Sequence, residues 1–150
     1  MQSHWIFQLN RNLHPTESDQ LTTLLQTSLA EWKAHGVPVK HRLAVLHDRF
    51  VVIHALSDAS GCSIDWLNRE VEQHVAQVSA AIEDPSQICY RTESGIECLH
   101  FMNLIQAIRA KGISPQTIMF DNTVVHGGTM ADWEKRIEDS WLAPRIGETA

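Results

Sequence analysis

The segment DASGCSIDW, residues 58–66, places a cysteine at the point where a helix is expected to begin. Gly61 permits a tight turn and Ser63 is expected to cap the helix. Asp65 then falls in the first turn, where a carboxylate complements the positive end of the helix dipole. A thiol close to the free N–H groups of such a turn is stabilised as the thiolate, which is the nucleophilic form. Cys62 is therefore a candidate catalytic nucleophile.

Two other interpretations of the same segment stay open. In the first, Cys62 is a small buried side chain that fills space between a sheet and the helix, as free cysteines commonly do. In the second, the backbone amides of Gly61, Cys62 and Ser63 bind an anion in the same first turn as Asp65, and the sulfur is incidental. The packing interpretation is preferred on sequence grounds.

Two histidines are candidate general bases for such a cysteine. His35, beside Gly36, is expected at the end of the first helix, from which its side chain could project toward Cys62. His54 is the second candidate and lies in a segment rich in Val and Ile. No complete Cys-His-acid arrangement can be derived from the spacing of these residues.

The nine histidines also raise the question of a metal site. If the hairpin formed by the segment around residues 39–56 turns at residues 48 and 49, His54 faces Leu43 and lies diagonal to His41, within reach of a shared metal. A shift of one residue in this register would separate the two imidazoles. No His-Glu-x-x-His or comparable spacing is present, so we predict neither a metal site nor a cofactor.

The pattern of apolar residues predicts an α+β protein. Strands are expected at residues 4–10, on either side of the turn at 48–49, at 87–91 and at 116–122, and helices at 16–32, 64–82, 94–112 and 129–141. The first six elements follow the βαββαβ order of ferredoxin-like folds, with further helices toward the C-terminus. We expect one domain over residues 1–150, with a largely antiparallel sheet of four or five strands, helices mainly on one face, and a frayed tail at 147–150.

Composition excludes several classes of protein. Eighteen acidic residues against twelve Lys and Arg leave a net charge of -6, which argues against a nucleic-acid binder. No apolar run approaches the roughly 20 residues of a membrane helix, and the first residues lack the pattern of a signal peptide. Cys62, Cys89 and Cys98 are odd in number and form no Cys-x-x-Cys pair, so we expect no disulfide framework and a cytoplasmic location.

The segment EWKAHGVPVKHRLAVLHDRFVVI, followed by SGCSID, resembles a family of short bacterial proteins of unknown function, many of which carry the label "ABC transporter ATPase". The similarity extends over most of the chain, including FDNTVV and EDSW. The residues do not support the ATPase label, because the chain has no Gly-x-x-x-x-Gly-Lys-Ser/Thr loop to bind phosphates. The resemblance implies a shared fold and a bacterial origin, and no mechanism.

Two functions follow from these observations. The preferred one is a non-catalytic interaction or ligand-binding module, whose partner is an unknown protein or a small anionic ligand. The alternative is a small cysteine-dependent enzyme or anion-binding protein with its site at residues 61–65. A pocket beside Cys62 that contains a histidine would favour the alternative, and a flat apolar patch would favour the module. Trp133 and Trp141 on the last predicted helix either cover the sheet or contact a second subunit. The second case would make the protein a homodimer.

Overall fold

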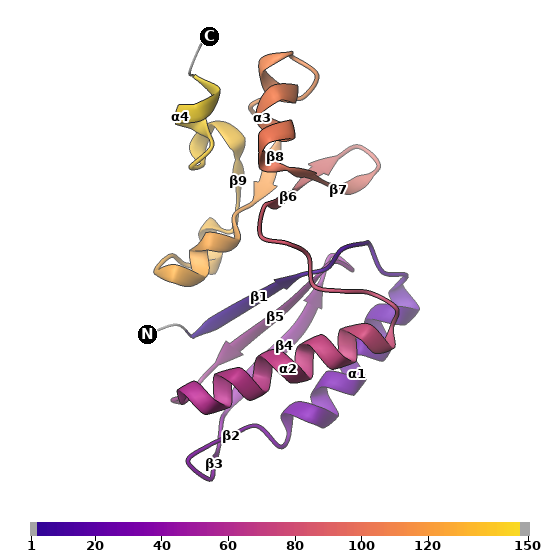
Figure 1. Cartoon of the computed structure of the whole chain (residues 1–150), viewed down its shortest axis with the longest axis vertical. Coiled ribbons are helices and arrows are strands. Elements are labelled where there is room, and N and C mark those ends of the chain that lie inside the picture. The colour runs from indigo at the N-terminus through magenta and orange to yellow at the C-terminus, as the bar shows by residue number, and fades with distance from the viewer. Residues whose placement is uncertain (1–2, 148–150) are drawn as a thin grey trace. The chain divides into compact units, whose positions relative to one another are not determined.

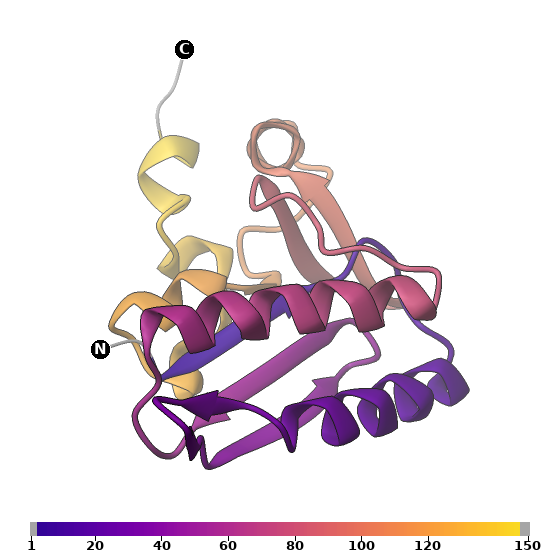
Figure 2. The ribbon, with the colours of Figure 1, turned by 60° about the horizontal axis from the view of Figure 1, so that its bottom comes forward.

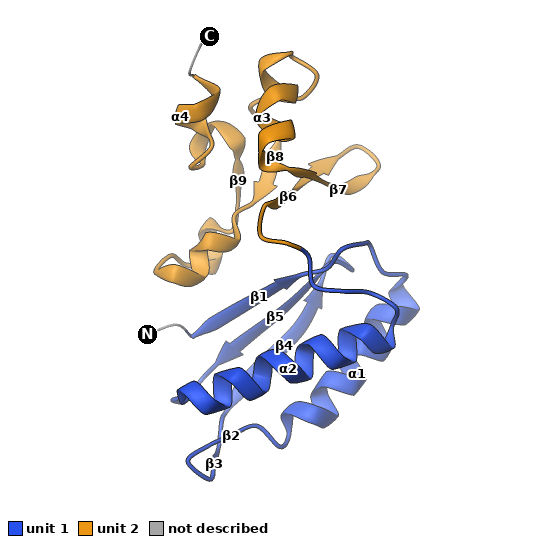
Figure 3. Cartoon of the chain, viewed as in Figure 1, with its two compact units in different colours: residues 1–83 blue, residues 84–150 orange. Residues whose placement is uncertain are grey.

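The computed structural model describes residues 3–147, so most of the predicted tail lies outside the described residues. The chain forms two compact units, residues 1–83 and 84–150 (Figure 3). Every strand pairing in them is antiparallel, which confirms the predicted α+β class with antiparallel sheets. The assignment of all 150 residues to one domain stays a prediction.

The first unit contains a three-stranded sheet, a short hairpin and two helices (Figure 1). The strand order in the sheet is β1-β5-β4. The elements are β1 (His4–Gln8), α1 (Pro15–Leu29), β2 (Lys33–Ala34), β3 (Val37–Pro38), β4 (His41–Leu46), β5 (Phe50–Ala55) and α2 (Gly61–Gln77).

Both helices of the first unit pack on the same face of its sheet, with α1 and α2 side by side (Figure 2). Each helix buries residues spaced four apart, the spacing that places side chains on one helical face. The buried core contains Leu21, Leu25 and Leu29 of α1, Leu67, Val71 and Val75 of α2, and Trp5, Phe7, Val51 and Ile53 of the sheet. The two predicted amphipathic helices are therefore confirmed, together with the sheet face that they cover.

The ferredoxin-like arrangement is not confirmed. The fourth strand of the predicted βαββαβ order is β6 (Gln87–Thr92), which pairs with β7 and β8 in a separate sheet of the second unit. The strands divide among a three-, a two- and a four-stranded sheet, so the expected single sheet of four or five strands does not form. The order of elements along the chain is compatible with one ferredoxin-like sheet and also with separate sheets, because strand pairing is set by long-range contacts.

The second unit is a four-stranded sheet with strand order β7-β6-β8-β9, covered by α3. Leu104, Ile105 and Ile108 of α3 pack against Ile88 and Met119 of the sheet. The further elements are β7 (Gly95–His100), α3 (Phe101–Arg109), β8 (Ile118–Phe120), β9 (Glu134–Arg136), α4 (Ala143–Ile146) and the 3-10 helices η1 (Asn122–His126), η2 (Met130–Asp132) and η3 (Ile137–Asp139).

Two predicted boundaries in the second unit are wrong. Ser94 lies in the turn between β6 and β7 and does not cap a helix, and α3 begins at Phe101 with His100 as its N-cap. The predicted helix at 129–141 is replaced by η2, β9 and η3, and β9 pairs with β8. The apolar residues of that segment match a helical period, but pairing with β8 at the sheet edge determines the structure.

The number and spacing of the cysteines led us to expect no disulfide framework, but the structure contains one disulfide. Cys89 and Cys98 lie directly opposite each other in the β6–β7 hairpin and form a disulfide, with Cα atoms 4.1 Å apart. Residue 98 was predicted to lie in a helix, so its pairing with Cys89 was not predicted. With the hairpin in place, the two cysteines are cross-strand neighbours, and Cys62 is left as the free thiol.

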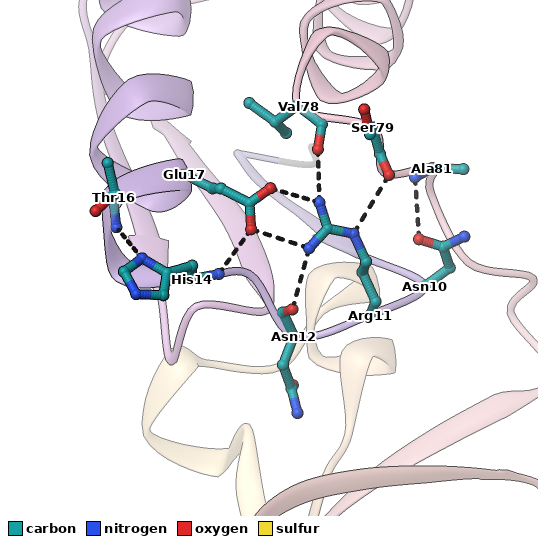
Figure 4. A network of polar contacts seen from close by, with 9 residues as sticks. All are labelled: Asn10, Arg11, Asn12, His14, Thr16, Glu17, Val78, Ser79 and Ala81. Atoms are coloured by element: carbon teal, nitrogen blue, oxygen red, sulfur yellow. Dashed lines mark hydrogen bonds and ion pairs between the residues drawn. The ribbon is translucent and has the colours of Figure 1, made fainter.

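A polar network ties the start of α1 to the end of α2 (Figure 4). The Arg11 guanidinium donates to both carboxylate oxygens of Glu17, at 3.0 and 2.7 Å, and to the backbone oxygens of Val78 and Ser79, at 2.6 and 3.3 Å. The hydrogen bonds from Arg11, and then the one from the backbone N–H of His14, lower the pKa of Glu17 to about 2. The ion pair between Arg11 and Glu17 at the surface therefore connects the start of α1 with the end of α2.

No helix among residues 3–147 combines the length and the apolar character needed to cross a membrane.

Candidate functional site

The first turn of α2 is shaped by two serines. The side chain of Ser60, the N-cap, accepts a hydrogen bond from the N–H of Ser63 at 3.2 Å, and the Ser63 hydroxyl accepts one from the N–H of Ser60 at 2.8 Å. This reciprocal arrangement is a capping box, which satisfies two backbone donors that a helix start leaves free. The prediction that Ser63 is the N-cap is therefore wrong, because the N-cap is Ser60 and the helix begins about one turn earlier.

Cys62 is the second residue of α2, and its side chain is exposed. The packing interpretation required this thiol to be buried between sheet and helix, so that interpretation is wrong. The inward position of the first turn is taken by Ser63, which is 4% exposed. Because the helix starts at Gly61, the side chain one position before Ser63 is turned away from the core.

The β2–β3 hairpin lies beside the start of α2 (Figure 2). Its residues Lys33 and His35 line the same surface hollow as Cys62. Its two-residue turn consists of His35 and Gly36, which both have positive φ, 52° and 78°, as the turns of tight hairpins require. The expectation that His35, beside Gly36, lies at the end of the first helix is therefore wrong, because α1 ends at Leu29. The buried Trp32 anchors the hairpin by donating its indole N–H to the backbone oxygen of Ser63 at 2.9 Å.

The hairpin and the first turn of α2 enclose a shallow surface pocket of about 640 Å³. Its lining includes Cys62 and Trp66 from α2, Lys33 and His35 from the hairpin, and Glu31 from the turn after α1. We call this hollow the Cys62 pocket. It places one free thiol, one imidazole and one ammonium group around the same space.

Three groups at the Cys62 pocket favour an anion, although the carboxylate of Glu31 also lines it. The N–H groups of Gly61 and Cys62 have no acceptor within the part of the chain that the structure describes, and both residues are exposed. These amides carry the partial positive charge of a helix of 17 residues, and Lys33 adds a full charge. A Cβ added at Gly61 would meet no atom within 4 Å, so the open space begins directly at this backbone.

The structure separates two of the predicted site residues from this pocket. Asp65 is exposed on α2, lies beyond its first turn and does not line the Cys62 pocket. His54 belongs to β5, where it is paired with Arg42 of β4 and with His4 of β1. Its ring stacks on that of His4, with centroids 4.0 Å apart, and burial together with the charge of His54 lowers the pKa of His4. Neither Asp65 nor His54 can act at the thiol in this structure.

The predicted register of the β4–β5 hairpin is wrong by one residue. Leu46 pairs with Phe50, so three residues form the turn, and Leu43 lies opposite Ile53 and not opposite His54. His41 therefore lies on the side of the sheet that faces the helices, where its ring is 5.5 Å from that of Trp32. His54 lies on the other side, because successive side chains of a strand alternate. Within residues 3–147, no three His, Cys, Asp or Glu side chains form a group that could hold a metal ion.

Four of the residues that line the Cys62 pocket were not assigned to a site from the sequence. They are Glu31, Lys33, Ser60 and Trp66. The spacing of Cys62 and Trp66, four residues apart on a helix, places them on one face and was available in the sequence. Lys33 and Glu31 could not be placed there without the β2–β3 hairpin.

Comparison of the chain with family models, with curated proteins and with solved structures returned no match. The resemblance drawn from the SGCSID segment stays a prediction, and function is argued from the geometry of the site.

Proposed function

We propose that this protein is a ligand-binding module that takes a small anionic group, such as a carboxylate or a phosphate, in the Cys62 pocket. The observation that carries the proposal is the meeting of two unpaired amides, those of Gly61 and Cys62, with Lys33 and His35 around one hollow. Amides at a helix N-terminus point toward a bound anion, and the helix dipole favours negative charge at the same place.

A second function is favoured by the position of the thiol. Cys62 is exposed and shares its pocket with His35, which supports the alternative of a cysteine-dependent enzyme. In that enzyme Cys62 would be the nucleophile, His35 the base, and the Gly61 and Cys62 amides the donors that stabilise negative charge on the substrate. The carboxylate of Glu31 also lines the Cys62 pocket, so an acidic group lies near the thiol and the imidazole. The binding module remains the first proposal because it needs no proton transfer between Cys62 and His35.

Calorimetric titration with inorganic phosphate tests the binding proposal. We expect saturable binding that is weakened in Lys33→Ala and unchanged in Lys40→Ala, a matched exposed lysine outside the pocket. Gly61→Ala should weaken binding while the protein stays as stable, because the added methyl group meets no atom and alanine is the better helix former. Equal binding by all three variants would rule out this pocket as the anion site.

Cys62→Ser separates the two candidate functions. The serine variant keeps the amides of the helix start, so a binding module should retain its affinity for phosphate. An enzyme would lose turnover of its substrate in this variant and retain binding, because the hydroxyl is a far weaker nucleophile than a thiolate.

A further inference from the structure

The sheet of the first unit ends at β4, and the outer edge of this strand is unpaired. β4 pairs with β5 on one side, and within residues 3–147 no strand pairs with it on the other. The N–H of Leu56 donates to the carbonyl of Lys40 at 2.7 Å, which sets the alternation of hydrogen bonds along the β4–β5 pairing. Even-numbered residues of β4 therefore bond to β5. The N–H and C=O groups of His41, Leu43 and Val45 are directed to the open edge.

The opposite edge of this sheet, on β1, is partly closed. Leu9, directly after β1, forms an antiparallel bridge with Ile82, and the carbonyl of Gln8 accepts a hydrogen bond from the N–H of Glu83 at 2.7 Å. In the described part of the chain, no such bond from another element reaches the outward backbone groups of β4. β4 is thus the edge of the sheet on which a further strand can form.

The two sides of this open edge carry different side chains. Leu43 and Val45 lie on the side that faces the helices, where they are half-buried against the core of the first unit. Lys40 and Arg42 lie on the other side, because side chains alternate along a strand, and both are exposed. A strand added at β4 would cover apolar surface on one side and meet two cations on the other.

The cations at this edge lack acidic partners. Neither Lys40 nor Arg42 forms an ion pair within residues 3–147. The segment 32–47 contains three Lys or Arg and no Asp or Glu. Asp48 follows the opposite end of β4, and its carboxylate accepts a hydrogen bond from the hydroxyl of Ser18 at 2.8 Å. The charge at the Lys40 end of the edge is therefore complementary to an acidic strand.

We infer that β4 binds an extended acidic segment of a partner protein, which adds a fourth strand to the three-stranded sheet. The outward backbone groups of β4 supply hydrogen bonds, and carboxylates beside Lys40 and Arg42 supply specificity. A second copy of this chain matches the edge less well. It would bring another Lys40 and another Arg42 to the same short edge, with no acid to offset them. This interaction does not depend on the anion site of the Cys62 pocket.

The charge of the partner is tested by ¹⁵N NMR titration with a hexapeptide, blocked at both ends, in which glutamate alternates with valine. The same peptide with lysine in place of glutamate is the comparison. We expect saturable shifts of the Leu43 and Val45 N–H resonances with the glutamate peptide, and binding of the lysine peptide weaker by about fivefold or more. Arg42→Glu should weaken binding of the glutamate peptide, whereas Arg69→Glu, at an exposed arginine of α2, should behave as wild type.

The strand pairing is tested by a proline at Val45. Val45→Pro removes one outward N–H and leaves the bonds to β5, because an edge strand accepts proline where its N–H faces solvent. Val45→Ala is the control, since it loses side-chain contacts and keeps the N–H. We expect binding of the glutamate peptide to be lost in Val45→Pro and retained in Val45→Ala. Arg42→Glu, at an exposed side chain, keeps the test decisive if the proline variant does not fold.

Three results would overturn the inference. Equal binding of the two peptides by the wild-type protein would rule out an acidic partner. The absence of binding by either peptide, or shifts that spare Leu43 and Val45, would show that the edge does not accept a strand. Dimerisation of the wild-type protein that is lost in Val45→Pro would show that a second copy occupies the edge in place of an acidic segment.

Discussion

The thiol of Cys62 is not needed for the geometry of the helix start, because Ser60 and Ser63 satisfy the backbone donors on either side of it. The buried position of the first turn belongs to Ser63, and the sulfur lies at the surface beside Lys33 and His35. The fold therefore does not require Cys62, and this residue lies in a pocket with basic neighbours. For these two reasons we place the proposed site there.

We predict that a small alkylating reagent modifies Cys62 in the folded protein at about pH 7, faster than Cys89 and Cys98. The exposed position also predicts that Cys62→Ser changes the free energy of unfolding by less than about 0.5 kcal/mol. Mass spectrometry of the native protein and urea unfolding measure the two effects. Modification of Cys62 only after unfolding would contradict the surface position.

A second prediction concerns Glu17, whose pKa is lowered to about 2 by Arg11 and the His14 amide. A carboxyl group with a depressed folded-state pKa stabilises the fold above its ordinary value of 4.5, and that contribution is lost as the pH falls toward about 2. Glu17→Gln should therefore lower the free energy of unfolding at neutral pH, and the difference from wild type should disappear at about pH 2.

Urea unfolding of both proteins across this range measures the effect, with Glu72→Gln as the control at an exposed site on α2. A difference between wild type and Glu17→Gln that stays constant down to the lowest pH would mean that the carboxylate charge plays no part in the Arg11 network.

At the scale of elements, long amphipathic helices were predictable and short paired strands were not. The spacing of Leu21, Leu25 and Leu29 identifies α1 without any tertiary contact, because helical bonds are local. The strands β8 and β9 are three residues each and gain their structure by pairing, which the sequence does not display. The same limit explains the displaced β4–β5 register, in which one extra turn residue moved His54 away from His41.

The β6–β7 hairpin provides a prediction at this scale. The disulfide between Cys89 and Cys98 closes a loop with a sequence separation of 9, and a crosslink over such a loop stabilises by about 2–3 kcal/mol, chiefly by restricting the unfolded chain. Reduction with dithiothreitol should lower the melting temperature of the wild-type protein. The double variant Cys89→Ala, Cys98→Ala should melt below oxidised wild type and show no response to the reductant.

Cys62→Ser, which keeps the disulfide, should respond to dithiothreitol as wild type does. Equal melting temperatures of oxidised and reduced protein would show that the crosslink does not contribute to stability.

At the scale of the whole molecule, each unit has its own apolar core. The first unit contains the Cys62 pocket, and all its lining residues lie within residues 1–83. The sequence predicted which types of element position the site, since the helices α1 and α2 and the β4–β5 hairpin were all expected. The pocket itself depends on the β2–β3 hairpin, whose strands are two residues long and have no periodic pattern.

We also predict that stoichiometric zinc leaves the melting temperature of the protein unchanged. Zinc sites need three or four converging ligands, and residues 3–147 contain no such group. The imidazoles of His4 and His54 are stacked with nearly parallel rings, 8° apart, which does not direct their nitrogens to one ion. A reproducible rise in melting temperature that is lost in His54→Ala would contradict this prediction.

The anion site is tested most directly by a ¹⁵N NMR titration of the protein with inorganic phosphate, because the two amides that define the site are themselves the reporters. We expect saturable shifts of the Gly61 and Cys62 N–H resonances, strongly reduced in Lys33→Ala and unchanged in Lys40→Ala. Small non-saturating shifts spread evenly over the exposed amides, with no preference for Gly61 and Cys62, would contradict it.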